Sequence, residues 1–283
     1  MALAGKLHPN MLALGAIGLW STLAALGVAL SHLPPFWLTG MALLIGSACA
    51  WPLMRGDLRQ WRVPPGTLLL GIYGLFGYHF LLFMALRLAP PVQANLINYL
   101  WPLGMVVMAP LFLPGLRLSA RQLLAALIGF AAAAWVIVGG STLERAPLAG
   151  YLLALGAAWA WASYSLLTRR VAAFPTAAIG LFGLVSGALS LLCHFLLEAP
   201  AVMQARDWVL LIAIGLGPLG AAFYLWDAAL KRGQPQQIGF LSFATPLLST
   251  LILSAVRGEM PSASLGLAGL LIVGAAWLGR ERR

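Results

Sequence analysis

Long apolar runs follow one another along almost the whole chain, and short stretches rich in proline, glycine and charged residues separate them. Each run provides the roughly 20 apolar residues that a helix needs to cross a membrane. The pattern predicts ten spanning helices, at residues 10–30, 34–54, 66–87, 92–113, 119–139, 148–168, 176–197, 208–230, 236–256 and 262–279. Because the links are short, neighbouring helices are expected to be antiparallel in one compact bundle. The predicted fold is therefore an all-α membrane protein.

The segment from Gly77 to Leu103 is repeated in outline in the second half of the chain. The matches share a single offset of 144 residues: Ala85-Leu86-Arg87 recurs as Ala229-Leu230-Lys231, Pro91 as Pro235, and Pro102-Leu103 as Pro246-Leu247. One offset held over such a length indicates an internal duplication. We predict two five-helix repeats, at residues 10–139 and 148–280.

The composition excludes a soluble fold. The chain is 61% hydrophobic and 8% charged, whereas soluble domains carry about 25% charged residues, so lipid has to be most of its solvent. The net charge of +10 would suit nucleic-acid binding, but the basic residues are dispersed between apolar runs. We therefore expect a lipid bilayer around this chain and no nucleic acid. Cys49 and Cys193 lie inside predicted spans and do not have the spacing of a metal site.

The distribution of lysine and arginine predicts the orientation of the helices. With the N-terminus in the cytoplasm, thirteen basic residues fall on the cytoplasmic side and four on the other. Both termini are then cytoplasmic. Since each repeat has an odd number of spans, the second repeat is inverted, which places Arg87 outside and its counterpart Lys231 inside. Inverted repeats are common in secondary transporters, where the substrate site lies at mid-depth between the halves.

Two features together resemble a known family. Ten spans in two inverted sets, with A-L-[RK]-x3-P and a downstream Pro-Leu in each half, resemble the drug/metabolite transporter (DMT) superfamily, EamA type, over about residues 10–280. Two aromatic segments, Tyr99-Leu100-Trp101-Pro102-Leu103 and Trp159-Ala160-Trp161-Ala162-Ser163-Tyr164, are most similar to aromatic amino-acid exporters of the YddG type. The resemblance implies a multi-pass inner-membrane exporter of amino acids and related metabolites.

An intramembrane enzyme is the alternative from a different functional class. The sequence contains no His-Glu-x-x-His or Gly-x-Ser-x-Gly motif and no cluster of acids that could hold a metal. No general acid and base are predicted at one depth. We expect neither enzymatic activity nor a metal or other cofactor. The expected partners are a small-molecule substrate and the bilayer, with a monomer as one option for the oligomeric state.

The first candidates for substrate binding are a histidine and a tyrosine near the middle of span three. Ionisable residues are rare and expensive at this depth. His79, beside Tyr78, could contact a substrate carboxylate or exchange a proton. The alternative is a histidine that a helix carbonyl satisfies.

Span four carries a second group of candidates. Asn95, Asn98 and Trp101 follow one another at about one helical turn, so they are expected to share a face, with Tyr99 next to them. Pro102 is expected to kink the helix and free a carbonyl for a substrate ammonium. The alternative is an ordinary kinked packing helix.

The first helix of each half supplies further aromatic residues. Trp20 and Trp161 are approximate counterparts in the two halves, and Ser163 and Tyr164 follow Trp161. The other candidate residues lie on spans eight and nine: Tyr224, Trp226 and Ser242. Helix packing is the alternative for all of these, and bonding to its own helix is the alternative for Ser242.

Charged residues within spans are few. Asp227 lies four residues before Lys231, a spacing that predicts an ion pair along one helix. His194 and Glu198 are also four apart, at the outer end of span seven, where they are expected to remain hydrated.

The predicted function is export of aromatic and other neutral amino acids, or similar metabolites, by alternating access through a central cavity. Tryptophan and tyrosine walls suit flat apolar side chains, and the lack of a fixed charge at mid-depth favours zwitterions. The alternative in the same superfamily is an exporter of cationic aromatic drugs with Asp227 as the charge partner.

Overall fold

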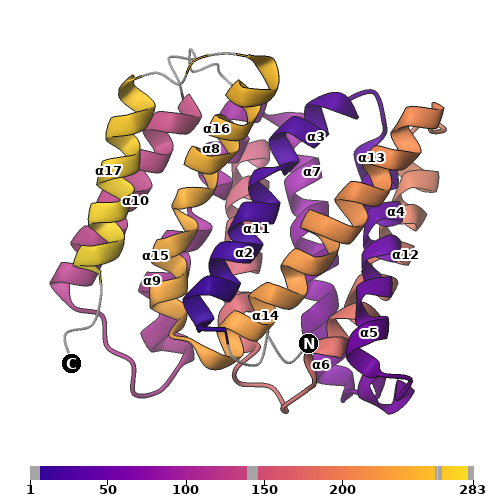
Figure 1. Cartoon of the computed structure of the whole chain (residues 1–283), viewed down its shortest axis with the longest axis horizontal. Coiled ribbons are helices and arrows are strands. Elements are labelled where there is room, and N and C mark those ends of the chain that lie inside the picture. The colour runs from indigo at the N-terminus through magenta and orange to yellow at the C-terminus, as the bar shows by residue number, and fades with distance from the viewer. Residues whose placement is uncertain (1–6, 139–145, 259, 261–262, 280–283) are drawn as a thin grey trace.

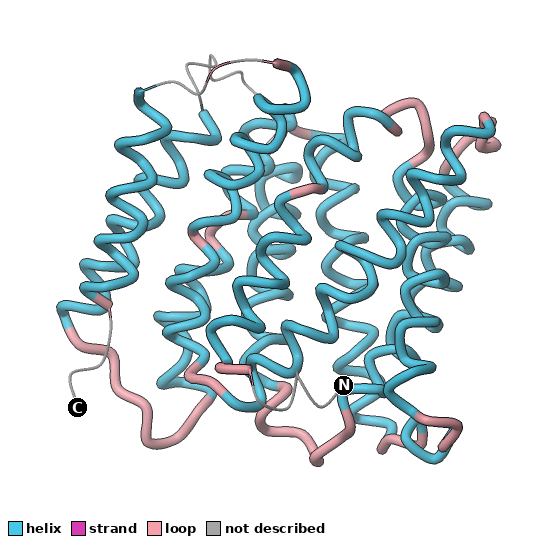
Figure 2. The backbone as a smooth tube through the Cα atoms, in the orientation of Figure 1, coloured by secondary structure: helices cyan, strands magenta, loops and turns pink. Residues whose placement is uncertain are grey.

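The computed structural model describes residues 7–138, 146–258, 260 and 263–279, and the described residues form helices and links without a strand (Figure 2). Helix is present in each of the ten predicted ranges. Eight of these segments are long and apolar enough to cross a membrane. The segment at Leu148–Leu167 is not among the eight, because its tryptophan, tyrosine and serine residues lower its mean hydropathy, and that at Ala263–Leu278 is shorter.

The first half contains five helical segments, several of them divided. They are α2 (Pro9–Ser21) with α3 (Leu23–Ala29); α4 (Pro35–Ser47), η1 (Ala48–Ala50) and α5 (Trp51–Met54); α6 (Pro65–Ile72), η3 (Tyr73–Gly77) and α7 (Tyr78–Leu88); α8 (Pro91–Asn98) with α9 (Trp101–Phe112); and α10 (Ala120–Val138). A short helix, η2 (Leu58–Trp61), lies in the link between α5 and α6. Proline at the first position starts four of the five segments, where its missing N–H costs no hydrogen bond.

The second half repeats this organisation. Its segments are α11 (Leu148–Leu167); η4 (Thr176–Ala178) with α12 (Ile179–Leu197); α13 (Ala205–Leu216), η5 (Gly217–Ala221) and α14 (Ala222–Arg232); α15 (Pro235–Ser242) with α16 (Ala244–Arg257); and α17 (Ala263–Leu278).

Local irregularities recur at the offset that the sequence shows. The π-helical turns η3 and η5 begin at Tyr73 and Gly217, which are equivalent positions of the two halves, and each turn is five residues long. The helices that follow them, α7 and α14, are both 11 residues long, and α8 and α15 are both eight. Because π-helical turns are rare and mark functional positions, their recurrence supports the duplication.

Each first helix packs into the opposite half. α2 contacts α14, α15 and α16, and α11 contacts α7, α8 and α9. α10 packs against α17 on one flank of the bundle and α4 against α12 on the other, with α2 and α11 between these flanks (Figure 1). Glycine permits the close approach of α4 and α12, since a Cβ at Gly187 would lie 2.9 Å from the carbonyl oxygen of Gly40.

The start of α2 and the end of α17 lie at the same end of the bundle (Figure 1). The links between α5 and α6, α9 and α10, α11 and α12, and α14 and α15 lie at this end as well. These are the links that the distribution of basic residues assigns to one face of the membrane.

Candidate functional site

Aromatic rings from both halves surround the indole of Trp161. The ring centroids lie 5.6 Å away for Trp20, 5.4 Å for Tyr78, 6.4 Å for Trp101, 5.3 Å for Tyr164, 5.7 Å for Phe223 and 6.2 Å for Trp226. We call these residues, together with His79, the aromatic cluster. Offset and edge-to-face ring pairs at such distances contribute about 0.5–1.5 kcal/mol each beyond area burial.

The exchange of first helices between the halves brings the cluster together. Trp161 and Tyr164 lie on α11, which packs against α7 and α9, the helices of Tyr78 and Trp101. Trp20 reaches the cluster on α2, which packs against α14. Gly74 makes room on the π-helical turn η3, because a Cβ there would lie 2.2 Å from the ring of Tyr164.

Residues at equivalent positions of the two halves meet within the cluster. Trp20 contacts its approximate counterpart Trp161. His79 contacts Phe223, which is its counterpart at the offset of the duplication, with ring centroids 6.4 Å apart. Equivalent positions can meet in this way where two similar halves adjoin, so the cluster lies between the two repeats.

The indole N–H groups of the cluster fall into two classes. Trp20 donates to the carbonyl oxygen of Pro218 at 3.0 Å, and Trp226 donates to Ser165 Oγ at 3.1 Å. The N–H groups of Trp101 and Trp161 have no acceptor among the described residues, although both side chains are buried. Neither indole nitrogen is among the fully buried atoms that lack a partner, so both N–H groups reach accessible space, where a ligand could accept from them.

His79 forms a hydrogen bond within its own helix. Its Nδ1 lies 2.6 Å from the carbonyl oxygen of Leu75, and since a carbonyl only accepts, Nδ1 carries the hydrogen. In a neutral ring Nε2 is then an acceptor, and no described residue donates to it. Nδ1 of His79 therefore has a partner, whereas Nε2 can accept a hydrogen bond from a ligand.

Asn98 joins the cluster through Tyr78. Its Nδ2 donates to the Tyr78 hydroxyl at 3.3 Å, whereas its Oδ1 is buried and has no partner in the part of the chain that the structure describes. The expectation that Asn95 shares this face is wrong, because Asn95 is exposed. Asn95 and Asn98 lie on the same helix, α8, whereas the break at Tyr99 and Leu100 places Trp101 at the start of a new helix, α9.

Four of the candidate residues lie outside the ring contacts. Ser163 donates to the carbonyl oxygen of Trp159 at 2.7 Å and Ser242 donates to that of Ile238 at 2.9 Å, each within its own helix.

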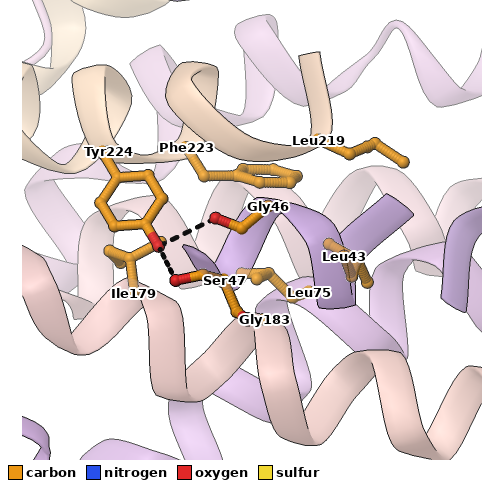
Figure 3. Close-up of a pocket in the computed structure, with 9 residues that line it drawn as sticks. All are labelled: Leu43, Gly46, Ser47, Leu75, Ile179, Gly183, Leu219, Phe223 and Tyr224. Atoms are coloured by element: carbon orange, nitrogen blue, oxygen red, sulfur yellow. Dashed lines mark hydrogen bonds between the residues drawn. The ribbon is translucent and has the colours of Figure 1, made fainter. Parts of the chain in front are cut away.

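The two tyrosines among these four lie at different places. Tyr99 is partly buried where α8 ends. Tyr224 is buried, but its hydroxyl donates to the carbonyl oxygens of Gly46 (3.1 Å) and Ser47 (3.3 Å) on α4 (Figure 3).

Tyr224 borders a crevice beside the cluster. Figure 3 shows this space, with Leu43, Leu75, Ile179, Gly183, Leu219 and Phe223 also around it. It is too narrow to admit a water molecule. A second cavity, of about 230 Å³, lies between α9 and α11 and has an almost wholly apolar lining. The rings of the cluster themselves contact one another, so the site is closed in this conformation.

Phe223 is the ring that sequence reasoning missed. It contacts Trp20, His79 and Trp161. The offset that identified the duplication relates it to His79, a candidate, and this is the signal that could have found it.

An ion pair lies next to the cluster on α14. Lys231 Nζ and Thr176 Oγ1 each donate to Asp227 Oδ2 at 2.6 Å, which confirms the predicted pair. Lys231 also donates to the carbonyl oxygen of Phe174 at 2.8 Å and lies 3.8 Å from the centroid of its ring.

A second ionic group lies at the opposite end of the bundle. Glu198 Oε1 accepts from Phe36 N (3.0 Å) and Arg87 (3.4 Å), and Oε2 accepts from Trp37 N (3.2 Å) and lies 3.0 Å from His194 Nδ1. The side chains of His194 and Glu198 are only 5% and 3% exposed. The expectation that this pair remains hydrated is therefore wrong, because Glu198 caps the start of α4 and is covered by it.

Within the described ranges, no group of three histidine, cysteine or acidic side chains could hold a metal ion.

The sequence profile of the EamA-like transporter family matches residues 9–138 and again residues 148–279. The chain is 43% identical to an aromatic amino acid exporter YddG of Ancylobacter novellus, over 92% of this chain and 93% of that protein. It is 26% identical to the protein of the same name in Escherichia coli, over 96% and 98%. A crystal structure of a protein 41% identical in sequence superposes with a TM-score of 0.90 and covers 96% of each chain.

These similarities, with the apolar helices, make the chain a multi-pass exporter of the inner membrane and not an enzyme. They also bear out the resemblance seen in its aromatic segments and in its repeated A-L-[RK]-x3-P pattern. The chain belongs to the EamA-like transporter family.

Proposed function

We propose that the chain exports aromatic and other neutral amino acids by alternating access, with the aromatic cluster as the substrate site. The observation that carries this proposal is the ring arrangement around Trp161, to which both halves contribute. Flat apolar side chains gain from such rings. The relatives named as aromatic amino acid exporters support the same substrate class.

The unpartnered polar atoms fit the two ends of a zwitterion. The indole N–H groups of Trp101 and Trp161, which have no acceptor in the described chain, can donate to a carboxylate, and the buried Asn98 Oδ1 can accept from an ammonium. The ring faces add cation–π attraction for the ammonium, worth about 2 kcal/mol when desolvated. The cluster is closed in this conformation, so its rings would have to move apart to admit a substrate.

The helices are proposed to form two inverted five-helix repeats with all ten segments in the membrane and both termini in the cytoplasm. The common end of α2 and α17 supports an even number of crossings (Figure 1). The basic residues concentrated in the links at this end support its cytoplasmic location. Rocking of the halves about the cluster would then open it to one side at a time.

Counterflow with purified protein in liposomes tests the proposal. Vesicles loaded with unlabelled phenylalanine should accumulate labelled phenylalanine, and tryptophan, methionine and leucine should compete. Protein-free liposomes provide the control. Failure of all four amino acids to exchange would overturn the proposed substrate class.

Export of cationic aromatic drugs is the alternative. It needs an acid with an uncompensated charge beside the rings, whereas the charge of Asp227 is balanced by Lys231 at 2.6 Å. We therefore favour neutral zwitterions. Exchange of a quaternary aromatic cation without any exchange of phenylalanine would favour the alternative.

A further inference from the structure

One carboxylate oxygen of Asp227 has no donor. The side chain is 2% exposed, and while Oδ2 accepts from Lys231 and Thr176, Oδ1 is buried and without a partner in the described chain. A buried acceptor of this kind costs free energy unless a donor reaches it. An ammonium group is the donor that suits a carboxylate oxygen best.

Lys231 is placed so that it can give up its partner. Its side chain is 26% exposed at the last turn of α14, and it retains the carbonyl oxygen and the ring of Phe174 as alternative contacts. A lysine is a point charge on a flexible four-carbon stem. The ion pair can therefore open without leaving the lysine charge buried and alone.

The pair adjoins the aromatic cluster. Trp226, the residue before Asp227, contacts Trp20 and Trp101. The hydroxyl of Tyr164 is close enough to the Asp227 carboxylate for the two to interact electrostatically, and its ring lies 5.3 Å from that of Trp161. A molecule held by Asp227 would therefore have aromatic rings within reach of its side chain.

The opposite end of the bundle lacks these properties. Arg87 is the counterpart of Lys231, but Phe83 occupies the position that corresponds to Asp227. The acid that Arg87 contacts, Glu198, has partners on both of its oxygens. Glu198 directly follows α12 and caps the start of α4, so it connects these two helices.

We propose that Asp227 and Lys231 are a receiving site for the amino-acid backbone, in which the substrate opens their ion pair. The ammonium binds Asp227 Oδ1 and the carboxylate binds Lys231, while the side chain lies toward Trp226 and Tyr164. The inference rests on the proposed function and adds to it a second binding position, at the end of the bundle assigned to the cytoplasm, where an exporter first meets its substrate.

The site selects molecules that carry both charges. A zwitterion replaces one ion pair by two, so every charge keeps a partner. An acid with the same ring leaves the buried Asp227 charge without a partner, which is strongly unfavourable, and an amine with the same ring lacks the carboxylate that binds Lys231. Phenylalanine should therefore bind better than an amine or an acid with the same ring.

The test is competition in the phenylalanine counterflow assay with the full chain. The competitors are 2-phenylethylamine, which has only the ammonium, and 3-phenylpropionate, which has only the carboxylate. With the wild type, each should compete at least about tenfold more weakly than phenylalanine, as the loss of a charge-assisted hydrogen bond predicts. Equal competition by either compound would overturn the proposal.

Two variants should shift this selectivity in opposite directions. Lys231→Met leaves the Asp227 charge without a partner, so 2-phenylethylamine should compete more strongly, relative to phenylalanine, than it does with the wild type. Asp227→Asn leaves the Lys231 charge without its acidic partner, so 3-phenylpropionate should compete more strongly, relative to phenylalanine, than it does with the wild type. In the control Asp207→Asn, which alters the His32 ion pair, the order of competitors should remain that of the wild type.

A purely structural ion pair predicts a different result. Both variants would then lower the amount of folded protein and the exchange of every substrate, with unchanged order of the competitors, and that outcome would overturn the proposal. Size-exclusion profiles report folding, and if neither variant folds, the wild-type competition decides. Absence of any phenylalanine exchange by the wild type is a separate result, which contradicts the proposed function.

Discussion

At the scale of single residues, the tryptophans of the aromatic cluster differ in whether the indole N–H has a partner. Trp226 is held by Ser165, and Trp20 by the carbonyl of Pro218 in the π-helical turn η5. Trp101 and Trp161 contribute their rings to the same cluster but leave their N–H groups without an acceptor in the described chain. The chemistry of these four side chains is the same, and their surroundings decide what each can do.

Replacing tryptophan by phenylalanine should separate the two roles. Trp161→Phe keeps an aromatic ring and removes a free donor, so phenylalanine exchange should weaken roughly five- to tenfold, the effect of a hydrogen bond of about 1 kcal/mol. Half-saturation of counterflow measures the change. The apparent melting temperature should move little.

Trp226→Phe is the matched comparison. It leaves Ser165 Oγ without its donor inside the protein, so stability should fall by about 1–3 kcal/mol, while half-saturation changes less than in Trp161→Phe. The opposite ranking of the two variants would contradict the assignment of free and occupied indoles.

At the scale of helices, close approach depends on glycine at particular faces. α4 lies between α12 and the α13–η5 segment. At Gly46 a Cβ would lie 2.5 Å from the carbonyl oxygen of Leu219 and 2.8 Å from that of Gly215. These contacts are to backbone, which cannot rotate away as a side chain can.

Gly46→Ala should therefore destabilise the bundle by about 1–3 kcal/mol, the cost of overpacking. The control is Gly27→Ala on α3, where a Cβ would meet nothing within 4 Å. There the change should be neutral or slightly stabilising, because alanine favours a helix by up to about 1 kcal/mol over glycine. Thermal unfolding in detergent compares them, and equal melting temperatures would contradict the packing described for α4.

At the scale of the whole molecule, the duplication explains why the cluster lies where it does. Trp20 meets Trp161, and His79 meets Phe223, because equivalent positions of two similar halves come together where the halves adjoin. The equivalent residues differ in chemistry at the second pair, so the two sides of the site are unequal. A substrate with distinct ends requires such inequality.

Labelling of equivalent links tests the inversion of the repeats. Leu58 and Val202 are equivalent positions of the two halves, follow spans two and seven, and are 61% and 79% exposed. In a background with Cys49 and Cys193 replaced by alanine, Leu58→Cys should react with an impermeant maleimide only after the cells are permeabilised. Val202→Cys should react from outside in intact cells. Reaction of both from the same side would contradict inversion.

Much of the fold followed from local sequence. Helix occurs in each of the ten ranges that the apolar runs predicted, and the ion pair of Asp227 and Lys231 follows from their spacing along one helix. Most of the candidate rings also lie in the aromatic cluster. They could be chosen from the sequence because tryptophan is less expected in the middle of a membrane span than at its ends. The burial of Glu198 was not predictable in this way, since its donors Phe36 and Trp37 lie 162 and 161 residues away.

The sequence by itself determined the helices, their duplication and the aromatic residues available for a site, because apolar runs, a constant offset and residue type are properties of neighbouring positions. Tertiary structure decided which rings meet, which indoles stay free and which carboxylate oxygen lacks a donor. Those outcomes depend on packing between helices far apart in the chain, as in the bond from Trp20 to Pro218 across 198 residues. No local pattern specifies such a contact.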